Sequence, residues 1–157
     1  MAQPRFIFRL EPLLDLRKQE EKQRQRAVAV LQQEINGLLG RIGEAENQIL
    51  RQDRELTAER LTGKLDMSYI AHEKRFVGAM RGLIATLQQQ LAQSYLRMAQ
   101  ARGALLAAAK ARKVIEKLRQ RQFERWAAEQ TRIENVQLDE IGTQLALRKL
   151  AEEAVGT

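Results

Sequence analysis

Apolar residues recur at alternating steps of three and four along most of the chain, and this spacing constrains the fold more than any other feature. The first run is Val28, Leu31, Ile35, Leu38, Ile42, Ala45, Ile49, Gln52 and Leu56. The second is Val77, Met80, Ile84, Leu87, Leu91, Ser94, Met98, Ala101, Leu105, Ala108, Arg112 and Ile115. Because an α-helix has 3.6 residues per turn, each run forms a narrow stripe on one helix face. Sustained over several heptads, such stripes predict a coiled coil.

The segment between the runs carries turn chemistry. Gly63 suits the position just after a helix, and Asp66 or Ser68 can cap the helix that follows. If the chain folds back here, the residue numbers of facing core residues should have a constant sum. The sum is 129 for Ile49 with Met80, Ile42 with Leu87, Leu38 with Leu91, Ile35 with Ser94, Leu31 with Met98, and Val28 with Ala101. The centre of the hairpin is therefore expected between Lys64 and Leu65.

The sequence thus predicts an all-α fold, a long antiparallel two-helix coiled-coil hairpin with a C-terminal helical overhang. We expect one domain over residues 1–157, with helix one at about 8–60, the turn at about 61–67 and helix two at about 68–153. The same register pairs Arg17 with Arg112, whose charges should repel. Helix one has ended by Phe6, opposite Phe123, so helix two should lack an intrachain partner beyond this point. The apolar residues expected there are Trp126, Ile133, Val136, Ile141 and Leu145.

The residues needed for catalysis or metal binding are missing. The chain has no cysteine and one histidine, His72, so neither a thiolate site nor a histidine-based metal site can be built within one chain. Gly63-Lys64 lacks the upstream residues of a phosphate-binding loop. We expect a protein that is no enzyme and binds no cofactor or small-molecule substrate. With no signal peptide and no run of roughly 18 apolar residues, it should be cytoplasmic.

Positive charge is concentrated near the open end of the expected hairpin. The net charge is +7, and residues 110–132 hold eight Lys and Arg against three acids. Such a local excess favours an acidic partner. The primary interpretation is a protein partner. A basic coiled-coil arm that binds nucleic acid, and a structural coiled-coil spacer that dimerises through its overhang, remain alternatives.

Two stretches resemble the flagellar export protein FliJ family of the type III export apparatus. They are Phe6-Ile7-Phe8-Arg9-Leu10-Glu11-Pro12-Leu13-Leu14 at the start, and Lys117-Leu118-Arg119-Gln120-Arg121 through Trp126 to Ile141. The resemblance implies a non-enzymatic stalk or chaperone component of the bacterial flagellum, with a role in its biogenesis, in protein transport and in chemotaxis. It would be peripheral to the inner membrane through the export apparatus.

The same resemblance implies partners and binding residues. The implied partners are the flagellar export ATPase ring, which the protein would bind and activate, the cytoplasmic domain of the export gate, and export chaperones. The residues expected to bind the ATPase are Arg9, Leu13, Arg17, Lys117, Arg121 and Trp126. Those expected to bind the gate are Phe76, Met80 and Leu83, and Met80 also belongs to the predicted seam.

Overall fold

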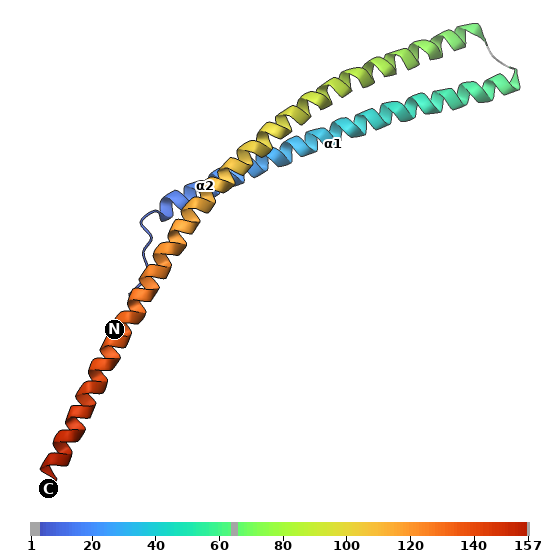
Figure 1. Ribbon diagram of the computed structural model, residues 1–157. Coiled ribbons are helices and arrows are strands. Elements are labelled where there is room, and N and C mark those ends of the chain that lie inside the picture. The colour runs from blue at the N-terminus through green and yellow to red at the C-terminus, as the bar shows by residue number, and fades with distance from the viewer. Residues whose placement is uncertain (1–3, 64–65, 157) are drawn as a thin grey trace. The chain divides into compact units, whose positions relative to one another are not determined.

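Two long helices make up the fold in a computed structural model that describes residues 4–63 and 66–156. Helix α1 is Glu11–Thr62 and helix α2 is Met67–Val155, and the two run antiparallel (Figure 1). The described part of the chain contains no strand. The predicted all-α hairpin is confirmed. None of the described helical stretches has the length and apolar character needed to cross a bilayer.

Helix α1 begins where a proline is tolerated. The first helical bond runs from the Leu14 amide to the Leu10 carbonyl oxygen, at 2.9 Å. Pro12 therefore lies in the first turn, where its missing N–H leaves no helical bond unmade. The Glu11 carboxylate also lies in this turn, where negative charge suits the helix dipole.

The connection between the helices uses the predicted turn residues. Gly63 follows the last residue of α1 and has a φ of 71°, a left-handed conformation that glycine adopts without a Cβ clash. The Asp66 carboxylate accepts hydrogen bonds from the Ser68 amide at 3.2 Å and the Ser68 hydroxyl at 2.6 Å. Asp66 rather than Ser68 is thus the cap of α2. Lys64 and Leu65, the expected centre of the hairpin, lie outside the described residues.

The chain divides into two compact units. Unit 2 is the continuous segment Gln19–Ala109, and unit 1 combines the chain before it with the chain after it. Unit 1 therefore contains the start of α1 together with the C-terminal part of α2, whereas unit 2 contains the turn.

The core of unit 2 is the predicted seam. Leu38, Ile42 and Leu87 form a buried cluster, against which Ile84 and Leu91 pack. Ile35, Ala45, Ser94 and Met98 are also buried in this unit. Every position of the two predicted runs is at least half-buried. The predicted register is confirmed at its centre, since Ile42 packs with Leu87 and Leu38 lies in the same cluster as Leu91.

A polar layer interrupts this seam. The Ser94 side chain is fully buried, and its hydroxyl donates to Oε1 of Glu34 at 2.8 Å. The Arg97 guanidinium donates to the Ser94 hydroxyl at 3.0 Å and also to the Glu34 carboxylate. The hydrogen bond from Ser94 is the main reason why the pKa of Glu34 is lowered from its ordinary value, and Arg97 lowers it further. Every polar group of the layer thus has a partner, as burial requires.

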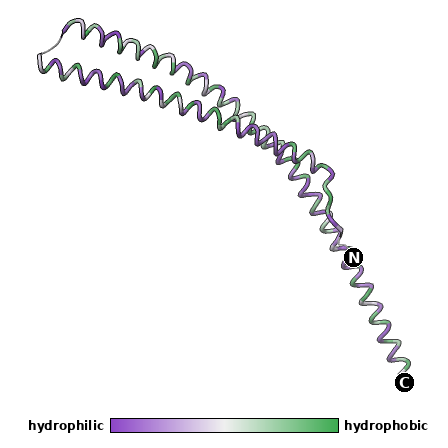
Figure 2. The backbone as a smooth tube through the Cα atoms, turned by 180° about the vertical axis from the view of Figure 1, so that it is seen from behind, coloured by the Kyte–Doolittle hydropathy of each residue, from purple (hydrophilic) through white to green (hydrophobic). Residues whose placement is uncertain are grey.

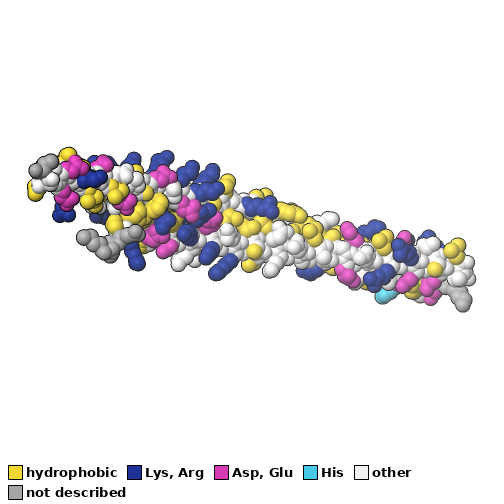
Figure 3. Space-filling model, turned by 90° about the horizontal axis from the view of Figure 1, so that it is seen from below, with side chains coloured by type: hydrophobic (Ala, Val, Ile, Leu, Met, Phe, Trp, Pro, Cys, Tyr) yellow, Lys and Arg dark blue, Asp and Glu magenta, His cyan; other side chains and the backbone are white. Residues whose placement is uncertain are grey.

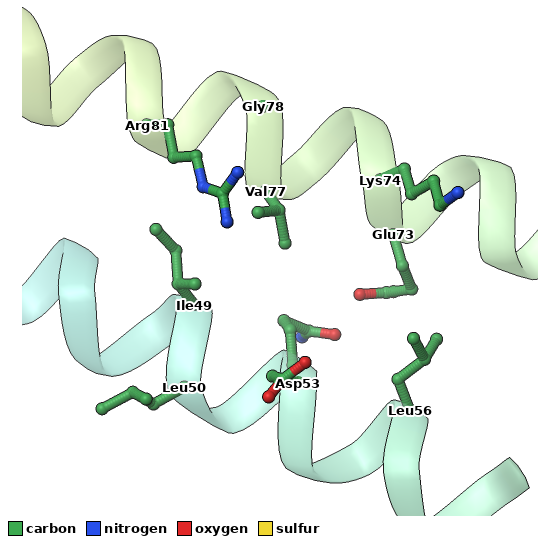
Figure 4. Close-up of a pocket in the computed structure, with 10 residues that line it drawn as sticks. Ile49, Leu50, Asp53, Leu56, Glu73, Lys74, Val77, Gly78 and Arg81 are labelled. Carbon is green, nitrogen blue, oxygen red and sulfur yellow. The ribbon is translucent and has the colours of Figure 1, made fainter.

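The seam opens between its centre and the turn. A cavity of about 540 Å³ lies between the helices here, and Ile49, Leu56 and Val77 line its apolar part (Figure 4). Charged side chains from both helices surround it, among them Asp53 and Glu73. The helices of unit 2 are therefore less closely packed here than around Leu87.

Candidate protein-binding surfaces

Three aromatic rings join the two chain segments of unit 1. The Phe6 ring lies 5.4 Å from the Phe123 ring in an edge-to-face arrangement and 5.8 Å from the Trp126 ring, measured between centroids. Phe123 and Trp126 are 5.9 Å apart. The expectation that Trp126 has no intrachain partner is therefore wrong. Phe6 precedes α1, and the non-helical chain before Glu11 extends the pairing beyond the helix.

Further contacts hold this N-terminal segment. Phe8 and Leu14 are buried, with exposed fractions of 6 % and 2 %. Nε of Arg119 donates to Oε2 of Glu11 at 3.0 Å, a bond between residues 108 positions apart. A half-exposed ion pair of this kind contributes only about 0–1 kcal/mol, so the buried apolar groups dominate. Phe8 was not among the core residues predicted from the heptad pattern, because it lies before the helix.

The two arginines expected to face each other are both accommodated. Arg17 and Arg112 are half-buried, and Nη1 of Arg112 bonds Oε2 of Glu116 at 2.6 Å, one helical turn along α2. Arg17 also has an interaction partner. The spacing of Arg112 and Glu116 is the signal that could have predicted this compensation, since residues four apart on a helix are neighbours.

All six residues expected to bind the ATPase fall in unit 1. From its N-terminal segment come Arg9, Leu13 and Arg17, and from α2 come Lys117, Arg121 and Trp126. Arg9, Lys117 and Arg121 are exposed, whereas the other three are half-buried. Two kinds of residue are thus present, charged side chains that solvent reaches and side chains that also hold the unit together.

A basic face on α2 extends this set. Lys113, Lys117, Arg121 and Arg125 follow one another every four residues, and all four are exposed. The exposed apolar residues Val114 and Leu118 lie beside them, and a shallow hollow is lined by Val114, Lys117, Leu118 and Arg121. Lys and Arg side chains stand out along this part of the surface, with hydrophobic side chains among them (Figure 3). The sequence already showed the basic residues of this face, which lie within the basic segment 110–132, but it did not single out Val114 as an exposed apolar neighbour.

Beyond Gln130, every described residue of α2 is exposed. Large hydrophobic side chains continue through this stretch, and Figure 2 shows hydrophobic residues recurring along it. They are Ile133, Val136, Leu138, Ile141, Leu145, Leu147, Leu150 and Val155. Single exposed apolar residues are ordinary, but a contiguous series on one helix marks an interaction surface.

The three residues expected to bind the gate lie on α2 within unit 2. Phe76 and Met80 are half-buried, and Leu83 is 38 % exposed. They flank the open part of the seam, where Val77 faces the cavity. Acidic residues are numerous nearby. Burial raises the pKa of the Tyr69 hydroxyl, and Glu59, Glu73 and Glu55 raise it further.

Among the described residues, no group of three or more His, Asp or Glu side chains is arranged to hold a metal ion. His72 is exposed. The features that gather side chains of distinct chemistry are the surfaces described above, and they are suited to contact with other macromolecules.

Comparison with known proteins identifies the family. The sequence profile described as "Flagellar FliJ protein" matches residues 6–151 of the 157. No curated protein and no solved structure matches the chain. The matched range includes the aromatic cluster, all of α1, the turn and α2 as far as residue 151. The chain therefore belongs to the flagellar FliJ family, whose members are non-catalytic components of the flagellar protein export apparatus.

Proposed function

We propose that this FliJ-family chain binds and activates the flagellar export ATPase ring through unit 1, and contacts the cytoplasmic domain of the export gate through unit 2. It works as a stalk without catalysing a reaction, and export chaperones are further partners. It acts in the cytoplasm and reaches the inner membrane only through these protein partners.

The observation that carries the ATPase proposal is the gathering of all six expected residues in unit 1, beside the basic face. Tryptophan and arginine are the residues that most often dominate the binding energy of protein interfaces. Lysine and arginine on one helix face also steer an acidic partner toward the surface before contact. The exposed Val114 and Leu118 supply apolar area that a charged face alone lacks.

The test is ATP hydrolysis by a flagellar export ATPase with and without this protein. We expect stimulation by the wild type and its loss in the double variant Lys117→Glu/Arg121→Glu. Both side chains are exposed on the surface of α2, so the variant should stay helical. Arg119 is left unchanged because it bonds Glu11.

The matched control is Arg41→Glu/Arg102→Glu, which changes the net charge equally at exposed positions of unit 2. Stimulation should persist in this control. Equal loss in both variants would show that net charge alone matters, and would contradict a site in unit 1. If the wild type neither stimulates nor forms a complex, the ATPase proposal fails. A salt titration against RNA would then test the nucleic-acid interpretation, because phosphate binding weakens steeply with salt.

The gate proposal needs a separate experiment, binding of the gate's cytoplasmic domain to immobilised protein. Leu83→Ala removes an apolar side chain that is 38 % exposed, and we expect weaker binding with unchanged thermal stability. Leu96→Ala, which removes an even more exposed leucine of the same helix and unit, should bind normally. Met80 is unsuitable as a first choice because its loss also opens the seam. Normal binding by Leu83→Ala and Phe76→Ala would overturn the site.

A further inference from the structure

The C-terminal part of α2 carries an apolar stripe that continues the heptad frame. Counted on from Trp126, the a positions include Ile133 and Leu147, and the d positions include Val136 and Leu150. Their side chains are 39 %, 61 %, 56 % and 62 % exposed, in that order. Their spacing is that of a coiled-coil seam, but no described residue of the chain covers them.

We propose that a second copy of this chain covers this stripe, so that two C-terminal segments pair as an antiparallel coiled coil. The residue numbers of facing core residues then add to 283. Ile133 faces Leu150 of the second copy, and Val136 faces Leu147 of the second copy. Glu140 faces Thr143 of the second copy, so each polar core residue meets another polar one. By symmetry every layer occurs twice.

Registers shifted by one heptad from the proposed one pair apolar core residues with polar ones. Shifted by one heptad in one direction, Ile133 would face Thr143 and Val136 would face Glu140. Shifted in the other direction, Leu150 would face Glu140 and Leu147 would face Thr143. Both shifts bury apolar side chains against polar ones, which leaves polar groups poorly solvated. Among antiparallel registers only the proposed one matches all four large side chains with one another, and a parallel in-register pair would bury the like charges of Glu140 against each other.

Charges flanking the stripe support the same register. In an antiparallel pair, g positions of the two helices face each other slightly beyond the core layer. Within unit 2 this geometry is observed, since Glu34 and Arg97 both occupy g positions and form an ion pair. Their numbers add to two more than the sum of the core pairs. Arg132 and Glu153 of the second copy are also g positions, and their numbers likewise add to two more than the core sum of 283. They carry opposite charges and can therefore form the same kind of ion pair.

An ion pair between Glu129 and Arg132 lies at the N-terminal end of the stripe. Glu129, a d position next to Ile133, would place a bare carboxylate against apolar groups. The Arg132 guanidinium instead holds it through two hydrogen bonds of 3.0 and 2.8 Å. These bonds lower the pKa of Glu129 and raise that of Arg132. An arginine has five N–H donors, so Arg132 can bind Glu153 of the second copy while keeping Glu129.

The central layer limits the strength of the pair. Glu140 and Thr143 are polar, and the Thr143 hydroxyl donates to the Asp139 carbonyl of its own helix at 2.8 Å. A short interface with polar side chains at its centre is expected to form a weak, reversible complex. The dimer would therefore shield the apolar stripe in the free protein and still yield to a partner that binds the same helix more tightly. This inference does not depend on ATPase binding.

Light scattering of the full-length chain over a range of concentrations is the first test. The mass should rise from the 18.0 kDa of one chain toward twice that value. Arg132→Glu should raise the dissociation constant about tenfold, because two attractive pairs become repulsive. Arg132→Glu/Glu153→Arg should recover part of the lost affinity, because the pairs between the two chains are attractive again, although Glu129 still lacks its hydrogen bonds from Arg132. Lys149→Glu, on the outer face of the same helix, serves as the control and should leave it nearly unchanged.

Disulfide cross-linking then fixes the orientation, and the chain suits it because it has no cysteine. A mixture of Val136→Cys and Leu147→Cys chains should form the mixed disulfide, with little of either homodisulfide. Homodisulfides of each variant alone would indicate parallel pairing and overturn the proposal. Efficient cross-linking of Ile141→Cys alone would place the contact on another face, with the same consequence. A constant monomer mass at every concentration would also overturn it.

Discussion

Ser94 fills a core position of unit 2 although its side chain is polar. Its burial is tolerated because the hydroxyl donates to Glu34 and accepts from Arg97, which leaves no group of the layer unsatisfied. A polar core layer of this kind penalises shifted registers, in which its groups would lose their partners. The ionised Glu34 carboxylate is the acceptor on which the layer depends.

We expect the hairpin to lose part of its stability at low pH through Glu34. The pKa of this carboxyl is lowered from 4.5, first by the Ser94 hydrogen bond and then by Arg97. A lowered folded-state pKa gives stability that is present above the unfolded-state pKa and is lost as the pH falls through the folded-state value. Thermal melts from pH 7 downward should therefore show a smaller pH-dependent loss in Glu34→Gln than in the wild type. Parallel curves for the two proteins would contradict this.

The glycines allow a second comparison at this scale. Gly63 has a positive φ, so Gly63→Ala should lower the free energy of unfolding by about 1 kcal/mol. Gly40 lies inside α1, where a Cβ would meet no atom within 4 Å. Gly40→Ala should raise the free energy of unfolding by about 1 kcal/mol, since alanine is the better helix former. Urea unfolding of both variants is the measurement, and a change of the same sign in both would be inconsistent with the role of Gly63 in the turn.

Among the structural elements, the N-terminal segment contributes most beyond the helices themselves. It is not helical before Glu11, yet it brings Phe6 onto the two rings of α2 and buries Phe8. Edge-to-face and tilted contacts of this kind contribute about 0.5–1.5 kcal/mol per pair beyond area burial. The segment thereby determines how much of α2 is covered.

Replacement of Phe6 by alanine should release Trp126 to solvent. Two ring contacts are lost, so we expect unit 1 to be destabilised by about 1–3 kcal/mol. The chain has one tryptophan, so its fluorescence reports this site directly, and the emission should shift to longer wavelength. Ile7→Ala removes a neighbouring side chain that is 80 % exposed and should leave the emission unchanged. Identical spectra for Phe6→Ala and the wild type would refute the aromatic contact.

This element also shows what the sequence could not predict. Heptad spacing predicts which residues of a helix face the partner, so the seam from Val28 to Leu56 and its register were accessible in advance. The register already placed Phe6 opposite Phe123, and these two rings are in contact. Phe6 and Phe8 nevertheless lie outside any helix, so no period predicted the contact of Phe6 with Trp126 or the burial of Phe8. Their burial depends on the path of an irregular backbone. The Ser94 partners were also missed, because they depend on rotamers rather than on spacing.

At the scale of the whole molecule, the pairing of one helix with the other follows from a single number, the constant sum of facing residues. The turn chemistry around Gly63 and Asp66 gives the same centre independently, which is why the hairpin could be predicted from sequence alone. The division into two units was not predicted, although the first run of apolar core positions begins only at Val28 and the core positions before it include Arg17, Glu21 and Arg24. The binding residues came from family resemblance and the basic segment 110–132 from the charge count, and the structure adds the exposure of these side chains and the hollow beside Lys117.

The discontinuity of unit 1 has a consequence for the order of folding. Its two segments are connected only through Gln19–Ala109, so contacts such as Glu11 with Arg119 close a loop of 108 residues, against 60 for Glu34 with Ser94. Closing a longer loop lowers the chain entropy more. Once unit 2 has folded, its antiparallel helices hold Gln19 and Ala109 at the same end of the hairpin. This raises the effective concentration of the two segments of unit 1 for each other.

We therefore expect the fragment 19–109 to fold alone with a cooperative helical melt, whereas separate peptides 1–18 and 110–157 should not pair at micromolar concentration. Circular dichroism of the fragment and of the peptide mixture measures both. Pairing of the peptides would show that unit 1 needs no tether. In the intact chain, folding then proceeds from the turn toward the termini and unfolding in reverse. We accordingly expect the aromatic cluster to be the last contact to form and the first to be lost when a partner or a denaturant separates the helices.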